Sequence, residues 1–464
     1  MTFPRFFAAG WGLCLLIISA VLSACADQAT QPVKIESRDI LARLESLPGI
    51  AVTEIPPENG FPRQFEIDIT QPVDHSLPGG LTFSQRLYLS HLDESAPVVF
   101  LPSGYTSYAS YRSELCDMLD ANQIHVTHRY MRRAQPANMD WSFLTIEQAA
   151  ADNHKVVELF KNIYQNFWVS YGRSKNGDTA LFHRRHYPAD VVATVALVAP
   201  LTFGIDDPRY EQFLAEQVGD AACREKIKRF QRSLLTHRAE LLPMIETYMQ
   251  NSPYTFTLGP GIILEYETCE FPFAFWQVTE GNCNAIPDTN ATATELYAYL
   301  EAGGGFRYYS NEYIEFYAPV YYQMYTEQGY YRLVNDHLTD LLVDVPVPSY
   351  ANFAPPGVDL IFKPEVIPAI VNWLQTEGNN IIYIYGGQDP WTAGAISSTG
   401  ATNALKLIEP GFNHSITIST MNNPGLVYIK LEEWLGVDIN QPVVSNVLPE
   451  IHKFLTLPGW IPEN

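Results

Sequence analysis

The chain has 464 residues and a formal net charge of −22 at pH 7, with 47% hydrophobic and 13% aromatic residues. Disordered chains are poor in both of these residue classes, so the composition excludes extended disorder and indicates a large folded core. The negative charge, without a basic patch interleaved with aromatic side chains, argues against nucleic acid as a partner.

The first 24 residues are predicted to be a signal peptide. Arg5 precedes an apolar run over residues 6–21 that is too short and too weakly flanked for a spanning helix. The run ends in LSAC at Cys25, which resembles the lipobox of bacterial lipoproteins. That resemblance implies cleavage before Cys25, a lipid anchor on its thiol, a tether over residues 25–37, and attachment to a bacterial membrane at the periplasmic face or cell surface. An ordinary signal peptide with an incidental cysteine is the alternative.

Four further cysteines follow in the mature chain: Cys116, Cys223, Cys269 and Cys283. An even number in an exported protein favours disulfides. Cys269 and Cys283 are close in sequence, so we expect them to pair and Cys116 to pair with Cys223, although three pairings are possible. The cysteines do not form CxxC knuckles, so we expect no metal site.

The hydrophobic pattern predicts one α/β domain. Two alternating runs, 64–73 and 81–92, predict half-exposed antiparallel strands. Short apolar runs then alternate with helical patterns, which predicts a mostly parallel sheet with helices on both faces. In chain order, we expect strand 97–101, helix 108–119, strand 123–130, helix 145–165, strand 167–171, a helix to 187, strand 191–198, helix 364–376, strands 380–385 and 404–408, and helix 426–435.

This alternation stops after Pro200. Residues 205–355 combine helical patterns with many aromatic side chains, and we interpret them as a largely helical cap. The α/β domain then comprises residues 38–204 and 356–464, with the cap inserted after the strand that ends near residue 200.

A candidate nucleophile lies where one predicted strand passes into a helix. Ser174 follows Gly172 and Arg173 between strand 167–171 and the next helix. A glycine two positions before the serine allows the sharp turn of a nucleophile elbow, and the helix presents free N–H groups to an oxyanion. This context predicts that Ser174 is a catalytic serine.

Two further residues complete a candidate triad. Asp389 follows strand 380–385, and His414 follows the strand after it. The order Ser, Asp, His along the chain is that of α/β-hydrolases and differs from chymotrypsin-like and subtilisin-like orders. The loop after strand 97–101 would supply the second oxyanion donor, so we expect the backbone N–H groups of Tyr105 and Lys175 to bind the oxyanion.

Several longer segments carry a family resemblance. They are THRYM at 127–131, LTIEQAAAD at 144–152, SKNG at 174–177, HRRHYPADV at 183–191, FWQ at 275–277, YQ at 322–323 and GGQDPW at 386–391. Together they resemble the S37 peptidases, the secreted bacterial prolyl tri- and tetrapeptidyl aminopeptidases of the α/β-hydrolase clan. The resemblance implies an enzyme without a cofactor that releases short peptides from polypeptide N-termini, usually after proline.

Two positions depart from the family pattern. Asn176 replaces a glycine after the nucleophile, and Ser103 replaces the glutamate of an EGY loop. If that glutamate binds the substrate amine, another carboxylate must do so here, and Glu267 or Glu270 are the candidates. The aromatic residues expected to line a substrate pocket are Phe275, Trp276, Tyr321 and Tyr322. Two alternatives remain: a serine esterase or lipase on the same scaffold, and a catalytically impaired lipoprotein that binds peptides through its cap.

Overall fold

The structure is a computed structural model that describes residues 39–279 and 281–441. It divides into a first compact unit, Met1–Ser46, and a second, Leu47–Asn464. Helix α2 (Ile40–Glu45) belongs to the first unit. The predicted signal peptide, the lipid anchor at Cys25 and the tether up to residue 37 lie outside the described residues.

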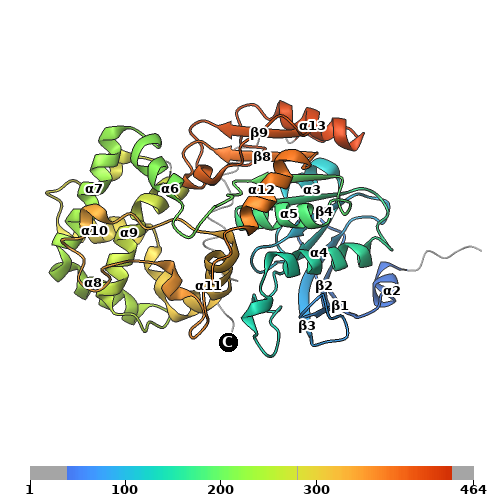
Figure 1. The fold of residues 1–464 in the computed structure, drawn as a ribbon, viewed down its shortest axis with the longest axis horizontal. Helices are drawn as coiled ribbons and strands as arrows, with labels where there is room; N and C mark the ends of the chain where they lie inside the picture. The colour runs from blue at the N-terminus through green and yellow to red at the C-terminus, as the bar shows by residue number, and fades with distance from the viewer. Residues whose placement is uncertain (1–38, 280, 442–464) are drawn as a thin grey trace, which may run out of the picture. The chain divides into compact units, whose positions relative to one another are not determined.

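The second unit contains a nine-stranded sheet in the order β1-β2-β3-β5-β4-β6-β7-β8-β9 (Figure 1). The pairs β1–β2, β2–β3 and β3–β5 are antiparallel, and the remaining pairs are parallel. The strands are β1 (Ile50–Ile55), β2 (Arg63–Pro72), β3 (Thr82–His91), β4 (Val98–Pro102), β5 (Asn122–Val126), β6 (Trp168–Arg173), β7 (Ala193–Leu197), β8 (Ile381–Gly386) and β9 (Ala404–Glu409). Eight of these strands match the predicted ones, whereas β1 was not predicted.

Helices cover both faces of the sheet, as the strand pattern predicted. They are α3 (Glu114–Leu119), α4 (Ile146–Phe160), α5 (Lys175–His186), α12 (Val366–Thr376) and α13 (Gly425–Leu435). Side chains alternate across a strand. In β8, Ile382 and Ile384 therefore pack in one core with α3 and α13, while Tyr383 and Tyr385 pack in another with α5 and α12.

The helix predicted over 108–119 is shorter than expected. It begins only at Glu114, because the buried side chain of Gln123 in β5 holds the preceding backbone. Gln123 Oε1 accepts the N–H of Ser113 at 2.9 Å, and its Nε2 donates to Tyr111 O at 2.5 Å. Ser113 then caps the helix by accepting the N–H of Cys116.

A helical cap lies between β7 and β8, where the aromatic insertion was predicted. Its helices are α6 (Pro208–Gln212), α7 (Ala221–Thr236), α8 (Arg238–Asn251), α9 (Pro260–Val278), α10 (Ala293–Ala302) and α11 (Asn311–Gln323), and Figure 1 shows α7 to α10 grouped away from the sheet. Short 3₁₀ or π segments are η1 (Trp141–Phe143), η2 (Phe213–Gln217), η3 (Cys283–Ala285), η4 (Gly305–Tyr309), η5 (Met324–Gln328), η6 (Asp336–Leu338), η7 (Tyr350–Phe353) and η8 (Pro390–Gly394). The cap has its own core, which is rich in aromatic rings.

The disulfide differs from the predicted pairing. Cys223, at the start of α7, bonds to Cys283 in η3, with their Cα atoms 5.5 Å apart, whereas Cys116 and Cys269 are free and buried. The prediction assumed that cysteines close in sequence pair. Helix α9 instead continues nine residues beyond Cys269, so the chain runs about 14 Å from Cys269 before it turns. Both predicted pairs, Cys269 with Cys283 and Cys116 with Cys223, are therefore wrong.

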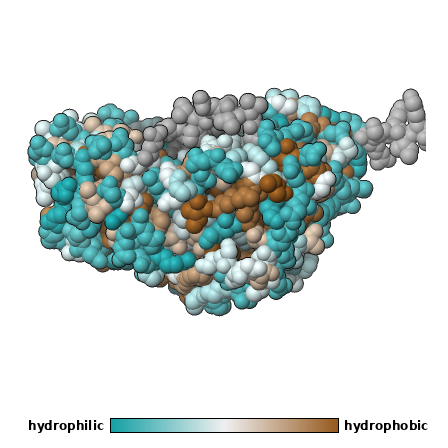
Figure 2. Space-filling view, turned by 90° about the horizontal axis from the view of Figure 1, so that it is seen from above, coloured by the Kyte–Doolittle hydropathy of each residue, from teal (hydrophilic) through white to brown (hydrophobic). Residues whose placement is uncertain are grey.

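Some apolar side chains remain at the surface of the second unit. Figure 2 shows an apolar area near the middle of the face drawn. Exposed large hydrophobic residues in the described chain include Ile408 of β9 and Leu426 and Ile429 of α13. None of the helices in residues 39–279 and 281–441 is long and apolar enough to cross a membrane.

Candidate active site

Ser174 occupies a strained turn between β6 and α5. Its φ of 55° and ψ of −134° lie outside the regions that ordinary residues prefer, a conformation that costs on the order of 1–3 kcal/mol. The turn is held because the Ser174 N–H donates to Leu197 O at 2.8 Å and Ser174 O accepts the N–H of Asp178. A Cβ on Gly172 would lie 2.2 Å from Asn176 O, so the turn requires glycine there.

The other two predicted triad members meet at the same edge of the sheet. Strands β6 to β9 are parallel, so their carboxyl ends lie together, and Ser174, Asp389 and His414 follow β6, β8 and β9. Asp389 is fully buried, and its Oδ2 lies 2.7 Å from His414 Nδ1. Because Asp389 accepts the proton on Nδ1, the other ring nitrogen of His414 is left as a base.

The loop that carries His414 is attached to the cap. The N–H of His414 donates to Gln277 O at 3.1 Å, and Asn413 Nδ2 donates to Thr279 O at 2.6 Å. Gln277 lies in the last turn of α9 and Thr279 directly follows it. The position of the candidate base therefore depends on the end of a cap helix.

Both predicted oxyanion donors lie beside the elbow. Lys175 is the first residue of α5, where the helix itself supplies no acceptor for its N–H. The loop after β4 packs directly on it, because a Cβ on Gly104 would lie 2.7 Å from Lys175 O. In this structure the N–H of Tyr105 donates to Ser103 Oγ at 2.9 Å.

The side chain of Lys175 links the elbow to the cap. Its Nζ donates to Gln323 Oε1 at 2.6 Å, at the end of α11. Burial lowers the pKa of Lys175 to about 8, although the nearby Asp178 carboxyl opposes this effect. Burial also raises the pKa of Asp178 well above its usual value. Only the backbone of Lys175 was predicted to take part in the site; its side-chain contact joins positions 148 residues apart, which no local pattern connects.

The four aromatic residues predicted to bind substrate do not form one pocket. Phe275 and Trp276 are buried in the cap core, where the Trp276 ring packs so closely that a Cβ on Gly219 would lie 2.3 Å from it. Tyr322 belongs to a separate cluster with Trp141. Tyr321 is partly exposed and stacks on Tyr350, with ring centroids 5.3 Å apart.

Three glutamates on α9 have different environments. Glu265 is fully buried and well satisfied, since its carboxylate accepts the backbone N–H groups of residues 343–345 and a hydrogen bond from Arg238 Nη1 at 2.6 Å. Glu267 and Glu270 have no cation beside them in the described part of the chain. Burial raises the pKa of Glu267 to about 7, against a hydrogen bond from Tyr309. Burial likewise raises the pKa of Glu270 to about 8, and the charge of Glu267 adds to the effect.

Glu270 is connected to the triad through two aromatic side chains. Tyr331 donates its hydroxyl to Glu270, with 2.9 Å to each carboxylate oxygen. The Tyr331 ring lies 5.4 Å from the Trp391 ring, and the backbone N–H of Trp391 donates to Asp389 Oδ1 at 3.2 Å. No local pattern predicted a role for Tyr331, which lies 61 residues from Glu270.

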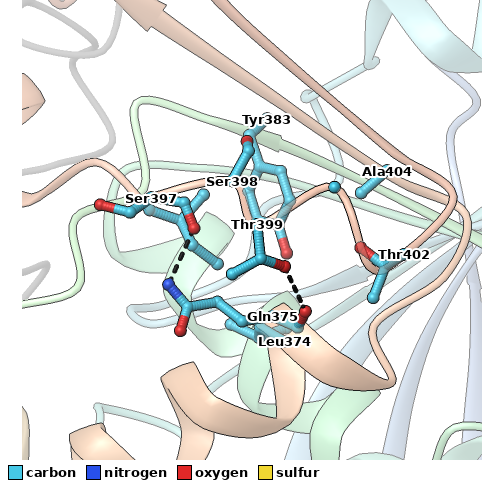
Figure 3. A pocket seen from close by; sticks show the side chains of 10 residues that line it. Leu374, Gln375, Tyr383, Ser397, Ser398, Thr399, Thr402 and Ala404 are labelled. Atoms are coloured by element: carbon cyan, nitrogen blue, oxygen red, sulfur yellow. Dashed lines mark hydrogen bonds between the residues drawn. The ribbon is translucent and has the colours of Figure 1, made fainter.

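Other candidate sites are separate from these residues. Figure 3 shows a pocket beside α12, where Gln375 Nε2 donates to Ser397 O and Thr399 Oγ1 donates to Gln375 O. The triad residues and the cap glutamates are not among those that line it. Within the described part of the chain, no cluster of three or more His, Cys, Asp or Glu side chains could hold a metal ion.

The sheet order, the helical cap and the placement of these residues at the strand ends define an α/β-hydrolase. The sequence model of the PS-10 peptidase S37 family matches residues 33–442. The chain therefore belongs to the S37 peptidase family and is a hydrolase. It is 31% identical over 432 residues to a prolyl tri/tetrapeptidyl aminopeptidase of Streptomyces mobaraensis, covering 91% of this chain and 90% of that protein.

Solved structures with the same general fold are much more distant. A proline iminopeptidase of Mycobacterium smegmatis is 12% identical with a TM-score of 0.35, covering 80% of this chain and 97% of that one. The peroxisomal alpha-beta-hydrolase Lpx1 of Saccharomyces cerevisiae is also 12% identical with a TM-score of 0.35, covering 88% of this chain and 94% of that one.

Proposed function

We propose that this protein is a serine peptidase that releases tri- and tetrapeptides, preferably ending in proline, from polypeptide N-termini. The observation that supports it most is the 2.7 Å bond between buried Asp389 and His414, at the sheet edge where Ser174 occupies its strained turn. The substrate class is proposed from the relative in Streptomyces mobaraensis, whose name describes this activity.

The proposed reaction is acyl transfer in two steps. Ser174 Oγ attacks the carbonyl carbon of the substrate proline while His414 takes its proton, and Asp389 stabilises the imidazolium. The N–H of Lys175 binds the oxyanion, and the N–H of Tyr105 joins it by exchanging its bond to Ser103 Oγ for one to the oxyanion. His414 then protonates the leaving amine. Water, activated by the same histidine, releases the short peptide from Ser174 and restores the hydroxyl.

Recognition of the free N-terminus is assigned to Glu270, supported by Glu267. Glu267 is buried and Glu270 half-buried one helical turn away, and within residues 39–279 and 281–441 neither forms an ion pair. Two such carboxylates are costly when both are charged. A substrate ammonium group would neutralise this charge in place. An extended tripeptide spans about 10 Å. A fixed separation between the carboxylate of Glu270, which holds the substrate amine, and Ser174 would therefore limit the length of the product.

The test compares an Ala-Ala-Pro anilide with a free amine and with an acetylated amine. We expect hydrolysis of the free-amine substrate at a much higher kcat/KM, and loss of this preference in Glu270→Gln. Glu246→Gln, an exposed glutamate of α8, is the matched control and should keep the preference. Equal rates on the two substrates would refute the aminopeptidase assignment but would leave the hydrolase assignment intact.

The two alternatives make different predictions. An esterase or lipase would hydrolyse acyl esters faster than proline-ending peptide amides in the same panel. A catalytically impaired binder would leave Ser174 unlabelled by a fluorophosphonate probe. Asn176, which replaces a glycine of the family pattern, would favour impairment if its side chain strained the elbow, yet it lies within α5 and is not among the residues with positive φ.

We further propose that the protein is exported and anchored to a bacterial membrane by lipid at Cys25, with peptides as its partners there. The LSAC sequence at Cys25 supports this proposal. Its test is given with the predictions below.

A further inference from the structure

The two positions that depart from the family motif contact each other. Ser103 Oγ lies 3.0 Å from Asn176 Oδ1, although 73 residues separate them. Asn176 Oδ1 also accepts the backbone N–H of Gly104 at 2.7 Å. Ser103 Oγ in turn accepts the N–H of Tyr105 at 2.9 Å. We call these contacts the Ser103–Asn176 bridge.

Within the bridge the donors and acceptors fit in one arrangement, and Thr106 O is a second, longer acceptor for the Ser103 hydroxyl at 3.5 Å. A backbone N–H can only donate, so the oxygen of the Asn176 amide must face Gly104. That oxygen cannot donate, so the Ser103 hydroxyl must give its hydrogen to it. The Ser103 oxygen is then free to accept the hydrogen of Tyr105. Each group is therefore used in the role that its chemistry allows.

Burial indicates that the bridge has a positioning role and does not contact substrate directly. Ser103 is 3% exposed; its hydroxyl donates to Asn176 and accepts from Tyr105. A buried neutral hydroxyl does not supply the negative charge of the glutamate in the family motif. Asn176 lies one residue beyond the Lys175 N–H, and the Tyr105 N–H, the second predicted oxyanion donor, is held on Ser103 Oγ until it exchanges that bond for one to an oxyanion. The bridge thus connects the two elements that must be held in register to bind an oxyanion.

We propose that Asn176 and Ser103 are positioning residues that fix the loop of Tyr105 against the nucleophile elbow and so set the geometry of the oxyanion site. This inference rests on the proposed serine peptidase function. Misplacing an oxyanion donor affects the transition state more than the bound substrate, so the bridge acts on kcat and not on KM. Removing one oxyanion donor outright costs on the order of 10²–10³ in kcat, and loss of the bridge should cost about tenfold or more.

The experiment measures kcat and KM on the free-amine Ala-Ala-Pro anilide for Asn176→Ala, Ser103→Ala and the double variant. We expect each single variant to lose about tenfold in kcat with KM within about threefold of wild type. The double variant should be no worse than Asn176→Ala alone, because the two residues act through one bridge. Ser103→Thr keeps the hydroxyl and should restore most of the activity. Asn372→Ala, an exposed helical asparagine on α12, is the matched control.

Amide hydrogen exchange tests the bridge without relying on catalysis. The Gly104 amide should exchange faster in Asn176→Ala, and the Tyr105 amide faster in Ser103→Ala, than in wild type. Unchanged exchange in both variants would overturn the inference. With an active wild type, a double variant whose loss in kcat equals the product of the two single losses would also overturn it. A wild type that hydrolyses no substrate and resists the fluorophosphonate probe would overturn the proposed function instead, and the exchange rates would still decide on the bridge.

Discussion

Replacing Glu267 by glutamine should stabilise the protein at pH 8 and have little effect at pH 5. Glu267 is 8% exposed, and burial raises its pKa from 4.5 to about 7. Between these pH values the folded protein binds more protons than the unfolded chain, so this group makes the free energy of unfolding fall as the pH rises. Glutamine has no proton to lose, and it keeps an oxygen that can accept the hydrogen bond from Tyr309.

The magnitude follows from the two pKa values. One pKa unit corresponds to about 1.4 kcal/mol. The Glu267 carboxylate therefore destabilises the fold by about 3 kcal/mol at pH 8 and by less than about 1 kcal/mol at pH 5. The stability gained by Glu267→Gln should grow by about 2–3 kcal/mol over this interval.

Urea unfolding of both proteins at pH 5, 6, 7 and 8 measures the difference directly. Asp178, whose pKa is also raised by burial, is common to both proteins and cancels in the comparison. Glu270 does not cancel fully, because the charge of Glu267 contributes to its raised pKa; removing that charge adds to the stability gained by Glu267→Gln at pH 8. Glu246→Gln, at an exposed position of α8, should run parallel to wild type. If the unfolding free energies of Glu267→Gln and wild type changed in parallel with pH, the claim that the Glu267 carboxyl is desolvated would be refuted.

Four further predictions concern single residues. Ser174→Ala should reduce hydrolysis by about 10⁴–10⁶-fold with unchanged thermal unfolding, and an active variant would end the triad hypothesis. Gly172→Ala should abolish activity and lower the yield of folded protein, because its Cβ would lie 2.2 Å from Asn176 O; normal kinetics and expression would contradict the tight elbow. Cys223→Ser opens a loop of 60 residues and should lower the unfolding free energy by about 4 kcal/mol in the chain-entropy model, whereas an unchanged urea midpoint would count against the Cys223–Cys283 bond. Cys25→Ser should yield an unlipidated protein in the soluble fraction without detergent, and persistent membrane attachment would argue against a lipid anchor.

The sheet was predictable because its strands carry a local signal. Strands such as β4, β7 and β8 are buried on both faces, so they appear in the sequence as short, continuous apolar runs. Strand β1 lies at the edge of the sheet and is mostly exposed or half-buried, so it lacks such a run. The positions of Ser174, Asp389 and His414 followed from these strands, because each residue comes shortly after one.

The cap was less predictable because its contacts join distant parts of the chain. The cluster of aromatic residues at 271–276 suggested a substrate pocket, yet Phe275 and Trp276 form the cap core. Aromatic composition does not distinguish these two roles. The partners of Glu267 and Glu270, Tyr309 and Tyr331, come from other segments that no local pattern connects to α9.

Helix α9 has a consequence for how the cap can move. The same helix carries Glu267 and Glu270, and its carboxyl end bonds to the loop of His414. A hinge motion that lifts α9 from the sheet would either break these bonds or draw the His414 loop along with the helix. Under the proposed function, the catalytic histidine would then be held in place only while the end of α9 is seated, and cleavage would be confined to flexible chain ends that enter beneath the closed cap.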